Sequence, residues 1–212
     1  PYEKYAGGYK VLEIGCGLGT MAMNWALNGS KITAVDLNDV AVLMTRKRFQ
    51  LLNLDGDIHR ENANALSFDD GEFDYTYSWG VLHHSPDLEK SISELMRVTK
   101  PNGEFGIMLY NRKSILHWYM TEYIEGFLHY ERYFLNSLQL ASRYGDGGRQ
   151  EGNPHTWPVT VREINKLIRP YSSKFRTTLL GTELDSIFKY LIPGLGMVFP
   201  IQAKKVWLEY MD

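Results

Sequence analysis

The sequence contains a single cysteine, Cys16, so an internal disulfide is excluded. No run approaches the roughly 20 apolar residues that a membrane span requires, and no secretory signal is visible. Basic residues number 23 and acidic residues 25, so the net charge of −2 lacks the basic excess that is typical of a broad nucleic-acid interface. We therefore expect a cytoplasmic protein with no membrane span and no nucleic-acid partner.

Length and composition are those of one globular domain. The apolar fraction is 44% and the charged fraction 23%, both ordinary for a folded chain, and 212 residues predict a single domain, 1–212. The chain begins at Pro1 rather than at a methionine and already enters an apolar run at Val11. We expect a further segment to precede Pro1.

Three glycines at alternate positions, Gly15, Gly17 and Gly19, follow the apolar run 11–14 and precede a predicted helix over residues 20–27. A glycine turn between a strand and a helix lets the backbone approach a ligand closely. A dinucleotide site requires G-x-G-x-x-G, but Thr20 stands at the third glycine position, and Glu13 would repel a phosphate. The turn favours a ligand that carries positive charge.

The pattern Glu13-x-Gly15-x-Gly17-x-Gly19 resembles the first motif of class I S-adenosylmethionine-dependent methyltransferases, in particular the small-molecule "type 11"-like group, which includes quinone- and sterol-pathway enzymes. The resemblance implies S-adenosylmethionine (SAM) as the cofactor and S-adenosylhomocysteine (SAH) as its product. It also implies methyl transfer to a small-molecule acceptor by in-line displacement. The cofactor-binding residues in this motif would be Glu13, Gly15, Cys16, Gly17 and Gly19.

A second predicted strand, 31–36, ends in an acid. Asp36 lies 17 residues after Gly19, close to the spacing at which a carboxylate binds ribose hydroxyls. Alternatively, Asp36 caps the helix predicted over 39–53, a role for which Asn38 and Asp39 compete. The neighbouring Leu37 is placed to touch an adenine face. We expect that helix to be amphipathic, with Val40, Leu43 and Met44 apolar.

After a predicted third strand, 58–62, the run from Ala63 to Asp74 resembles the family's G-D-A-x-x-L-P-F-x-D-x-x-F-D segment, in which the first Asp binds the adenine amino group. Asn64 stands at that position, followed by Ala65. An Asn carbonyl can accept a hydrogen bond from the amine, while its NH₂ can meet N1.

The fourth predicted strand, 73–78, leads into the loop 79–87, which should face the methyl donor because ligands lie beyond the carboxyl ends of such strands. The stretch from Ser78 to His84 is similar to the family's S-x-x-x-L-H-H segment, and it adds Ser78 and His83 to the cofactor-binding candidates. It lacks the N/D-P-P-Y/F motif of nucleic-acid amino-methyltransferases. No further ligand accompanies His83, His84 and Asp87 at metal-site spacing, so we expect no metal.

The catalytic candidates are His83, His84 and His155, each of which could act as a general base if the acceptor must lose a proton. For His83 and His84 the alternative is that they brace the loop by hydrogen bonds. Tyr144 and Trp157 are further candidates on the acceptor side.

The remaining elements continue the alternation of strands and helices. The segment L-x-R-V-T-K-P-N-G-E-F resembles the family's helix, turn and fifth strand. Apolar residues from Leu116 to Phe134 recur at steps of four and three, which predicts one face of a helix or bent helical pair, capped by Ser114. Further predicted elements are a helix over 88–99, a turn at 100–103, a strand over 104–110, a helix from the capping box Thr160–Glu163 to 169, strands over 174–180 and 203–210, and a turn at 193–196.

Together these segments predict a doubly wound, mostly parallel, seven-stranded Rossmann-like sheet, with the last strand antiparallel as in the family. Residues 1–112 would form the SAM-binding core, 113–158 a helical insertion that covers the acceptor site, and 159–212 the C-terminal part of the sheet. Two other functions stay open. One is an NAD-dependent oxidoreductase, which Thr20 and Glu13 disfavour, and the other is a SAM-binding protein without methyltransferase activity.

Overall fold

The computed structural model describes residues 2–144, 155–180 and 205–210. The chain packs as two compact units: residues 1–82, 87–107 and 209–212 form the first, and residues 83–86 and 108–208 form the second. The turn predicted at 193–196 lies outside the described residues, as does most of the loop that precedes His155.

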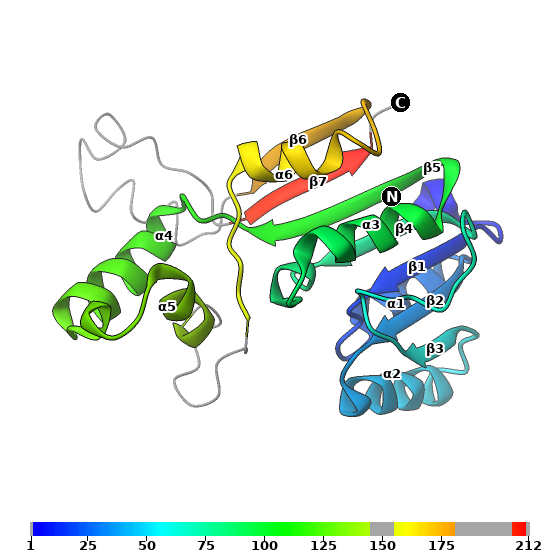
Figure 1. Ribbon diagram of the computed structural model, residues 1–212. Coiled ribbons are helices and arrows are strands. Elements are labelled where there is room, and N and C mark those ends of the chain that lie inside the picture. The colour runs from blue at the N-terminus through cyan, green and yellow to red at the C-terminus, as the bar shows by residue number, and fades with distance from the viewer. Residues whose placement is uncertain (1, 145–154, 181–204, 211–212) are drawn as a thin grey trace. The chain divides into compact units, whose positions relative to one another are not determined.

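The first unit alternates strands and helices as the sequence predicts (Figure 1). Two local features account for this pattern. The strands are either wholly apolar or alternate apolar and polar side chains, and each helix begins directly after a Gly, Asn or Asp residue. Its elements are β1 (Lys10–Ile14), α1 (Thr20–Leu27), β2 (Lys31–Asp36), α2 (Asp39–Leu51), β3 (Asp57–Arg60), β4 (Phe73–Trp79), α3 (Leu88–Val98) and the greater part of β5 (Thr99–Tyr110).

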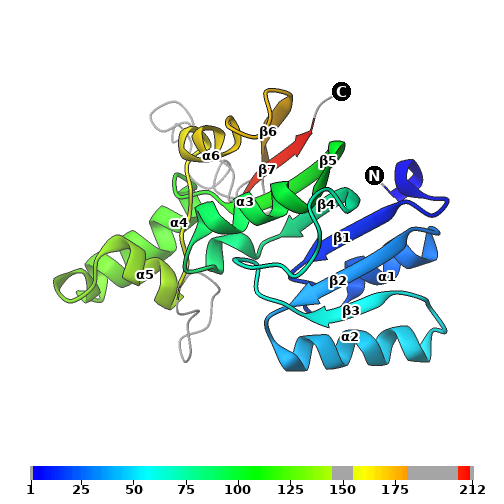
Figure 2. The same cartoon turned by 45° about the vertical axis from the view of Figure 1, so that its right-hand side comes forward.

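The strands of this unit lie in the order β3-β2-β1-β4-β5. β1 pairs in parallel with both β2 and β4, and β2 pairs in parallel with β3. The chain therefore runs outward from β1 to β3 and returns to β4 on the other side of β1. Right-handed crossovers then place α1 and α3 on opposite faces of the sheet (Figure 2). The carboxyl ends of β1 and β4 flank a switch point, where α/β proteins bind ligands.

An aromatic cluster packs one face of this sheet. Tyr5 stacks on Tyr75 with ring centroids 4.7 Å apart, and Trp25 of α1 lies 5.5 Å from Tyr75 and 5.6 Å from Tyr77. All four rings are buried. β1 itself is buried from Val11 onward, as expected of a parallel strand that is covered on both faces.

The predicted apolar face of α2 is wrong. Val40, Leu43 and Met44 are exposed, whereas the helix buries Ala41, Val42, Thr45 and Phe49. The small side chain of Thr45 explains the difference, because it lets the helix approach the glycine turn: a Cβ on Gly19 would lie 2.5 Å from Thr45 Cγ2. A helical apolar pattern does not reveal such a contact between a side chain and a backbone.

β5 begins at Thr99, so the strand includes residues 100–103, where the sequence predicts a turn. Asn102 has a φ of 66°, so the backbone bends sharply there without leaving the strand. Asparagine tolerates this left-handed conformation better than most residues.

The second unit is mainly helical. Ser114 caps its first helix as predicted, accepting a hydrogen bond from the N–H of His117, and the capping box of Thr160 and Glu163 is complete. Its elements are α4 (Ile115–His117), the π-helix η3 (Trp118–Leu128), the 3₁₀ turn η4 (Glu131–Tyr133), α5 (Ser137–Tyr144), α6 (Val161–Ile168), β6 (Phe175–Leu180) and most of β7 (Lys205–Tyr210). No helix in the described parts of the chain is long and apolar enough to cross a membrane.

The helix predicted after Ser114 is present, but its apolar face is not the buried one. Phe127 and Phe134 are 67% and 84% exposed, whereas Thr121 and Gly126 are buried. A π-helix has i→i+5 hydrogen bonds, so residues five apart share a face. The residues that η3 buries, Thr121 and Gly126, are accordingly five apart and do not follow the spacing of four and three.

Candidate functional site

The glycine turn after β1 combines three left-handed residues. Gly15, Gly17 and Gly19 have φ values of 85°, 53° and 75°, which side chains disfavour. A Cβ on Gly15 would lie 2.3 Å from a methyl group of Val81, and Gly19 is equally closed by Thr45. At Gly17, by contrast, nothing lies within 4 Å of an added Cβ. Gly15 and Gly19 are required by packing, whereas Gly17 borders open space.

Asp36 lies directly beside this open position. Its Oδ2 accepts the N–H of Gly17 at 2.9 Å, and its Oδ1 accepts the N–H of Asn38 at 2.9 Å. Asn38, not Asp36, caps α2, because its side chain accepts from Val40 and Ala41. The alternative capping role of Asp36 is therefore excluded. Leu37 is 59% exposed next to the carboxylate, so both residues can meet a ligand at the ends of β1 and β2.

Glu13 is buried, and its carboxyl faces α1. The backbone N–H of Ala22, in the first turn of α1, and the Tyr77 hydroxyl both lie close to it. Among the described residues Oε2 has no hydrogen-bond partner. Burial raises the pKa of Glu13 to about 8 because the charged form loses its hydration. Near neutral pH the free protein therefore holds this carboxyl largely as the neutral acid, which differs from the anionic role that the sequence suggests.

We expect Glu13 to make stability fall as pH rises. Between the unperturbed value of 4.5 and about 8, the folded protein holds more protons than the unfolded chain, so the free energy of unfolding drops by at most about 1.4 kcal/mol per pH unit. Urea denaturation across this range should show the decline in wild type and not in Glu13→Gln. The exposed Glu3→Gln should follow wild type, and identical profiles for all three proteins would contradict the prediction.

Asn64 is buried in the turn between β3 and β4. Its amide nitrogen donates to the Asp87 carbonyl at 2.6 Å and to Ser91 Oγ at 3.0 Å. The amide nitrogen is therefore committed to the start of α3, contrary to its suggested contact with N1. A contact from the Asn64 side chain to an adenine amine would use Oδ1. The next residue, Ala65, is exposed.

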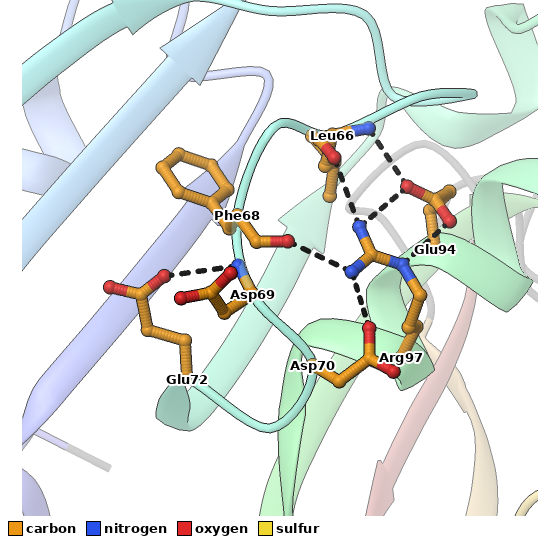
Figure 3. Close-up of polar contacts among 7 residues, drawn as sticks. All are labelled: Leu66, Phe68, Asp69, Asp70, Glu72, Glu94 and Arg97. Carbon is orange, nitrogen blue, oxygen red and sulfur yellow. Dashed lines mark hydrogen bonds and ion pairs between the residues drawn. The ribbon is translucent and has the colours of Figure 1, made fainter.

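A clamp from α3 holds the segment that follows Asn64 and Ala65 (Figure 3). Glu94 Oε2 accepts the N–H of Leu66 at 2.8 Å, while Arg97 Nη2 donates to the carbonyl of Leu66 at 2.9 Å. Arg97 also donates to the carbonyl of Phe68 and to Asp70, and it forms two bonds to Glu94. The Arg97 guanidinium lowers the pKa of Glu94. Both backbone groups of Leu66 are thus fixed by one ion pair.

Removing this clamp should destabilise the first unit. Arg97→Met deletes all these donors and leaves a half-buried Glu94, so we expect a loss of about 2–4 kcal/mol in the free energy of unfolding. Asp70→Asn is the matched control: the Asp70 side chain is 82% exposed, and its change should stay within about 0.5 kcal/mol. Chemical denaturation of both variants measures the difference, and equal losses would contradict a clamp centred on Leu66.

Two residues that the sequence predicts to bind the cofactor, Ser78 and Cys16, use their side chains for contacts within the protein. The Ser78 hydroxyl is buried and donates to the carbonyl of Ile14 at 2.9 Å, so it ties β4 to β1. Cys16 is buried against Thr45, and burial raises the pKa of its thiol to about 12. Cys16 is therefore a neutral packing residue rather than a nucleophile.

The three catalytic candidates lie together in the second unit. The ring of His83 is 4.1 Å from that of His84 and 4.0 Å from that of Tyr110. His84 Nδ1 lies 3.2 Å from the carbonyl oxygen of His155 and 3.2 Å from Thr156 Oγ1. The carbonyl of His83 accepts the N–H of Trp157 at 2.8 Å. Residues 83–84, 110 and 155–157 thus form one histidine cluster.

Within the histidine cluster, His83 is completely buried, and neither ring nitrogen has a hydrogen-bond partner among the described residues. Burial, followed by the proximity of His84, lowers the pKa of His83 well below its usual range, so its ring is neutral. The ring of His155 stacks on that of Trp157 with centroids 6.4 Å apart. Tyr144, at the end of α5, makes no contact with this cluster in the described contacts. No group of three potential metal ligands occurs in the described parts of the chain.

Sequence reasoning missed Val81 and Thr45, which close the glycine turn, and the clamp residues Glu94 and Arg97. Val81 and Thr45 carry no signal of their own, because only the tertiary structure brings them against Gly15 and Gly19. Arg97 of the clamp lies in the L-x-R-V segment, which predicts a helix but does not predict the contacts of its arginine.

Known proteins resemble this chain most clearly over the first unit. Residues 12–107 match the family model described as "Methyltransferase domain". The phthiotriol/phenolphthiotriol dimycocerosates methyltransferase of Mycobacterium tuberculosis is 35% identical over 101 residues, which cover 47% of this chain and 37% of that protein. Methyltransferase GfsG of Streptomyces halstedii is 25% identical over 217 residues, covering 100% of this chain and 73% of GfsG.

A solved structure shows the same fold. The SAM-dependent methyltransferase from Methanosarcina mazei superposes with a TM-score of 0.67 at 22% identity, covering 98% of this chain and 95% of that one. The family match runs from β1 into β5, and it includes the glycine turn, Asp36, Asn64 and the clamp.

Proposed function

We propose that this chain is a class I SAM-dependent methyltransferase that transfers a methyl group to a small-molecule acceptor, because residues 12–107 match the family model described as "Methyltransferase domain". The relatives named above support this activity. This chain spans 37% of the length of the Mycobacterium tuberculosis relative, so the acceptor is inferred from the chain's own residues.

One observation carries the cofactor assignment. At the switch point of the sheet, the backbone of Gly17 borders open space, and the carboxylate that accepts its N–H belongs to Asp36. A carboxylate retains lone pairs for two ribose hydroxyls after accepting two backbone N–H groups. Glu13 lies behind the same turn, its Oε2 has no hydrogen-bond partner among the described residues, and a cationic ligand there would favour the ionised form of its carboxyl. These residues fit SAM, with Leu37 and the segment of Asn64 and Ala65 on the adenine side.

SAM supplies an activated methyl group on a sulfonium, so the protein mainly has to hold the acceptor in line with it. Where the acceptor must lose a proton, we assign this task to the histidine cluster. The carbonyl of His155 accepts from Nδ1 of His84, which makes Nε2 the basic nitrogen of that ring. His83 is then a packing residue that positions His84, with ring centroids 4.1 Å apart.

The proposal extends to the whole fold. We propose that β7 and β6 continue the sheet beyond β5, with β7 antiparallel, and that residues 113–158 cover the acceptor site. The strand order β5-β7-β6 supports the first point, and the helical content of 115–144 supports the second. We place the protein in the cytoplasm, a compartment that suits a chain with a single cysteine.

Calorimetric titration with SAH tests the cofactor assignment. We expect saturable binding at one site, and no binding or protection by NADH. Methyl transfer is then measured with isotopically labelled SAM against a panel of small hydroxyl, amine and carbon acceptors. Folded protein that binds NADH but not SAH would overturn the cofactor assignment, whereas tight SAH binding without transfer to any acceptor would favour a SAM-binding protein of other function.

A further inference from the structure

The helical part of the second unit contains a hollow that includes none of the residues assigned above to cofactor binding or catalysis. Its volume is about 480 Å³, which lies in the range of small-molecule sites. All of its walls belong to η3, η4 and the start of α5, so they form within one unit. The lining residues are Trp118, Glu122, Tyr123, Phe127, Arg132 and Ser137.

Three aromatic rings form one wall of the hollow. Trp118 and Tyr123 lie 5.7 Å apart at an angle of 21°, and Tyr123 and Phe127 lie 5.9 Å apart at 17°. The π-helical turn produces this ladder, because it places residues five and four apart on one face. The rings stay 55%, 36% and 67% exposed. Solvent-facing rings that are already parallel lose little entropy when a flat ligand stacks on them.

The rest of the lining is polar but electrically balanced. Arg132 Nη1 lies 2.5 Å from Glu122 Oε2, and the Arg132 guanidinium also contacts Ser137 Oγ at 3.2 Å. Gly126 leaves room for the Arg132 side chain, since a Cβ there would lie 3.0 Å from Arg132 Cγ. Because the cation and the anion neutralise each other, the hollow offers no net charge to a ligand.

We propose that this hollow binds the planar, uncharged, aromatic or conjugated part of a small molecule by stacking on Trp118, Tyr123 and Phe127. The proposal goes beyond the proposed function and does not rest on it. The ligand class is therefore a flat, apolar compound rather than a charged metabolite.

Two probes that differ by a single sulfonate test this assignment on the full chain. N-phenyl-1-naphthylamine is uncharged, and 8-anilinonaphthalene-1-sulfonate adds one negative charge to the same rings. We expect saturable binding of the uncharged probe, with energy transfer from tryptophan. Phe127→Ala and Trp118→Ala should each weaken it about tenfold. Phe134→Ala is the matched control, since this ring is 84% exposed and does not line the hollow, and it should leave the affinity unchanged.

Glu122→Gln supplies the charge test. It frees the positive charge of Arg132, so the sulfonated probe should bind about five- to tenfold more tightly, while the uncharged probe should not change. Equal losses in Phe127→Ala and Phe134→Ala, or no saturable binding of the uncharged probe, would overturn the proposal. SAH titration of the wild-type chain keeps the two questions apart. Absent probe binding with intact SAH binding rejects the hollow alone, whereas probe binding without SAH binding rejects the methyltransferase assignment alone.

Discussion

Replacing Gly17 by alanine is expected to abolish cofactor binding while leaving a folded protein. The residue has a φ of 53°, so an alanine costs about 1–2 kcal/mol in backbone strain. Its new Cβ meets nothing within 4 Å in the protein, but it would occupy the space in which a ligand approaches the backbone. Calorimetry with SAH should show a loss of affinity of at least about 100-fold, which corresponds to roughly 3 kcal/mol.

Gly15→Ala is the matched comparison. Its Cβ would fall 2.3 Å from Val81 at a φ of 85°, so we expect a loss of stability of at least about 3 kcal/mol from overpacking and strain together. Thermal or urea denaturation separates the two glycines. A Gly17→Ala protein that binds SAH as wild type does would contradict the assignment of the open space to the cofactor.

Asp36→Ala is expected to have the second large effect. The carboxylate accepts the N–H groups of Gly17 and Asn38 and, in the proposed complex, the ribose hydroxyls. Losing charge-assisted bonds to the ribose should weaken SAH binding about 100-fold. The loss of two backbone acceptors should also cost about 1–3 kcal/mol in stability.

Two further variants separate the contributions to this effect. Asp36→Asn keeps one of the two acceptors and turns an NH₂ group toward the other backbone N–H, so it should recover only part of the stability and little of the affinity. Asp39→Ala removes a neighbouring carboxylate that is 79% exposed and should change neither quantity. Equal SAH affinity in Asp36→Ala and Asp39→Ala would remove Asp36 from the site.

The clamp and Glu13 connect these effects to the rest of the first unit. Arg97 and Glu94 fix the backbone of Leu66, directly after the proposed adenine contacts. A substitution of either residue in α3 should therefore change the affinity for the ligand. Glu13 lies on the opposite side of the glycine turn, where α1 begins. The turn is thus supported from the helix side by a buried acid and from the strand side by Asp36.

The order of strands and helices could be read from the sequence because it depends on local patterns. The run 11–14 before three glycines, the acid at the end of the second strand, the Ser114 cap and the capping box at Thr160 each act over a few residues, and each is present as predicted. The same local signals identified Gly17 and Asp36, whose contact depends only on adjacent parallel strands ending at one edge.

Tertiary structure alone decided which surfaces the helices bury and how the acids and histidines are charged. Because Thr45 packs against Gly19, α2 buries a different face from the predicted one. In η3, π-helical hydrogen bonding determines which residues share a face. Burial left Glu13 largely protonated near neutral pH and His83 uncharged. Burial and helix contacts depend on residues distant in the chain, so the sequence alone did not determine them. The positions of strands and helix caps along the chain depend on neighbouring residues, so the sequence by itself determined those.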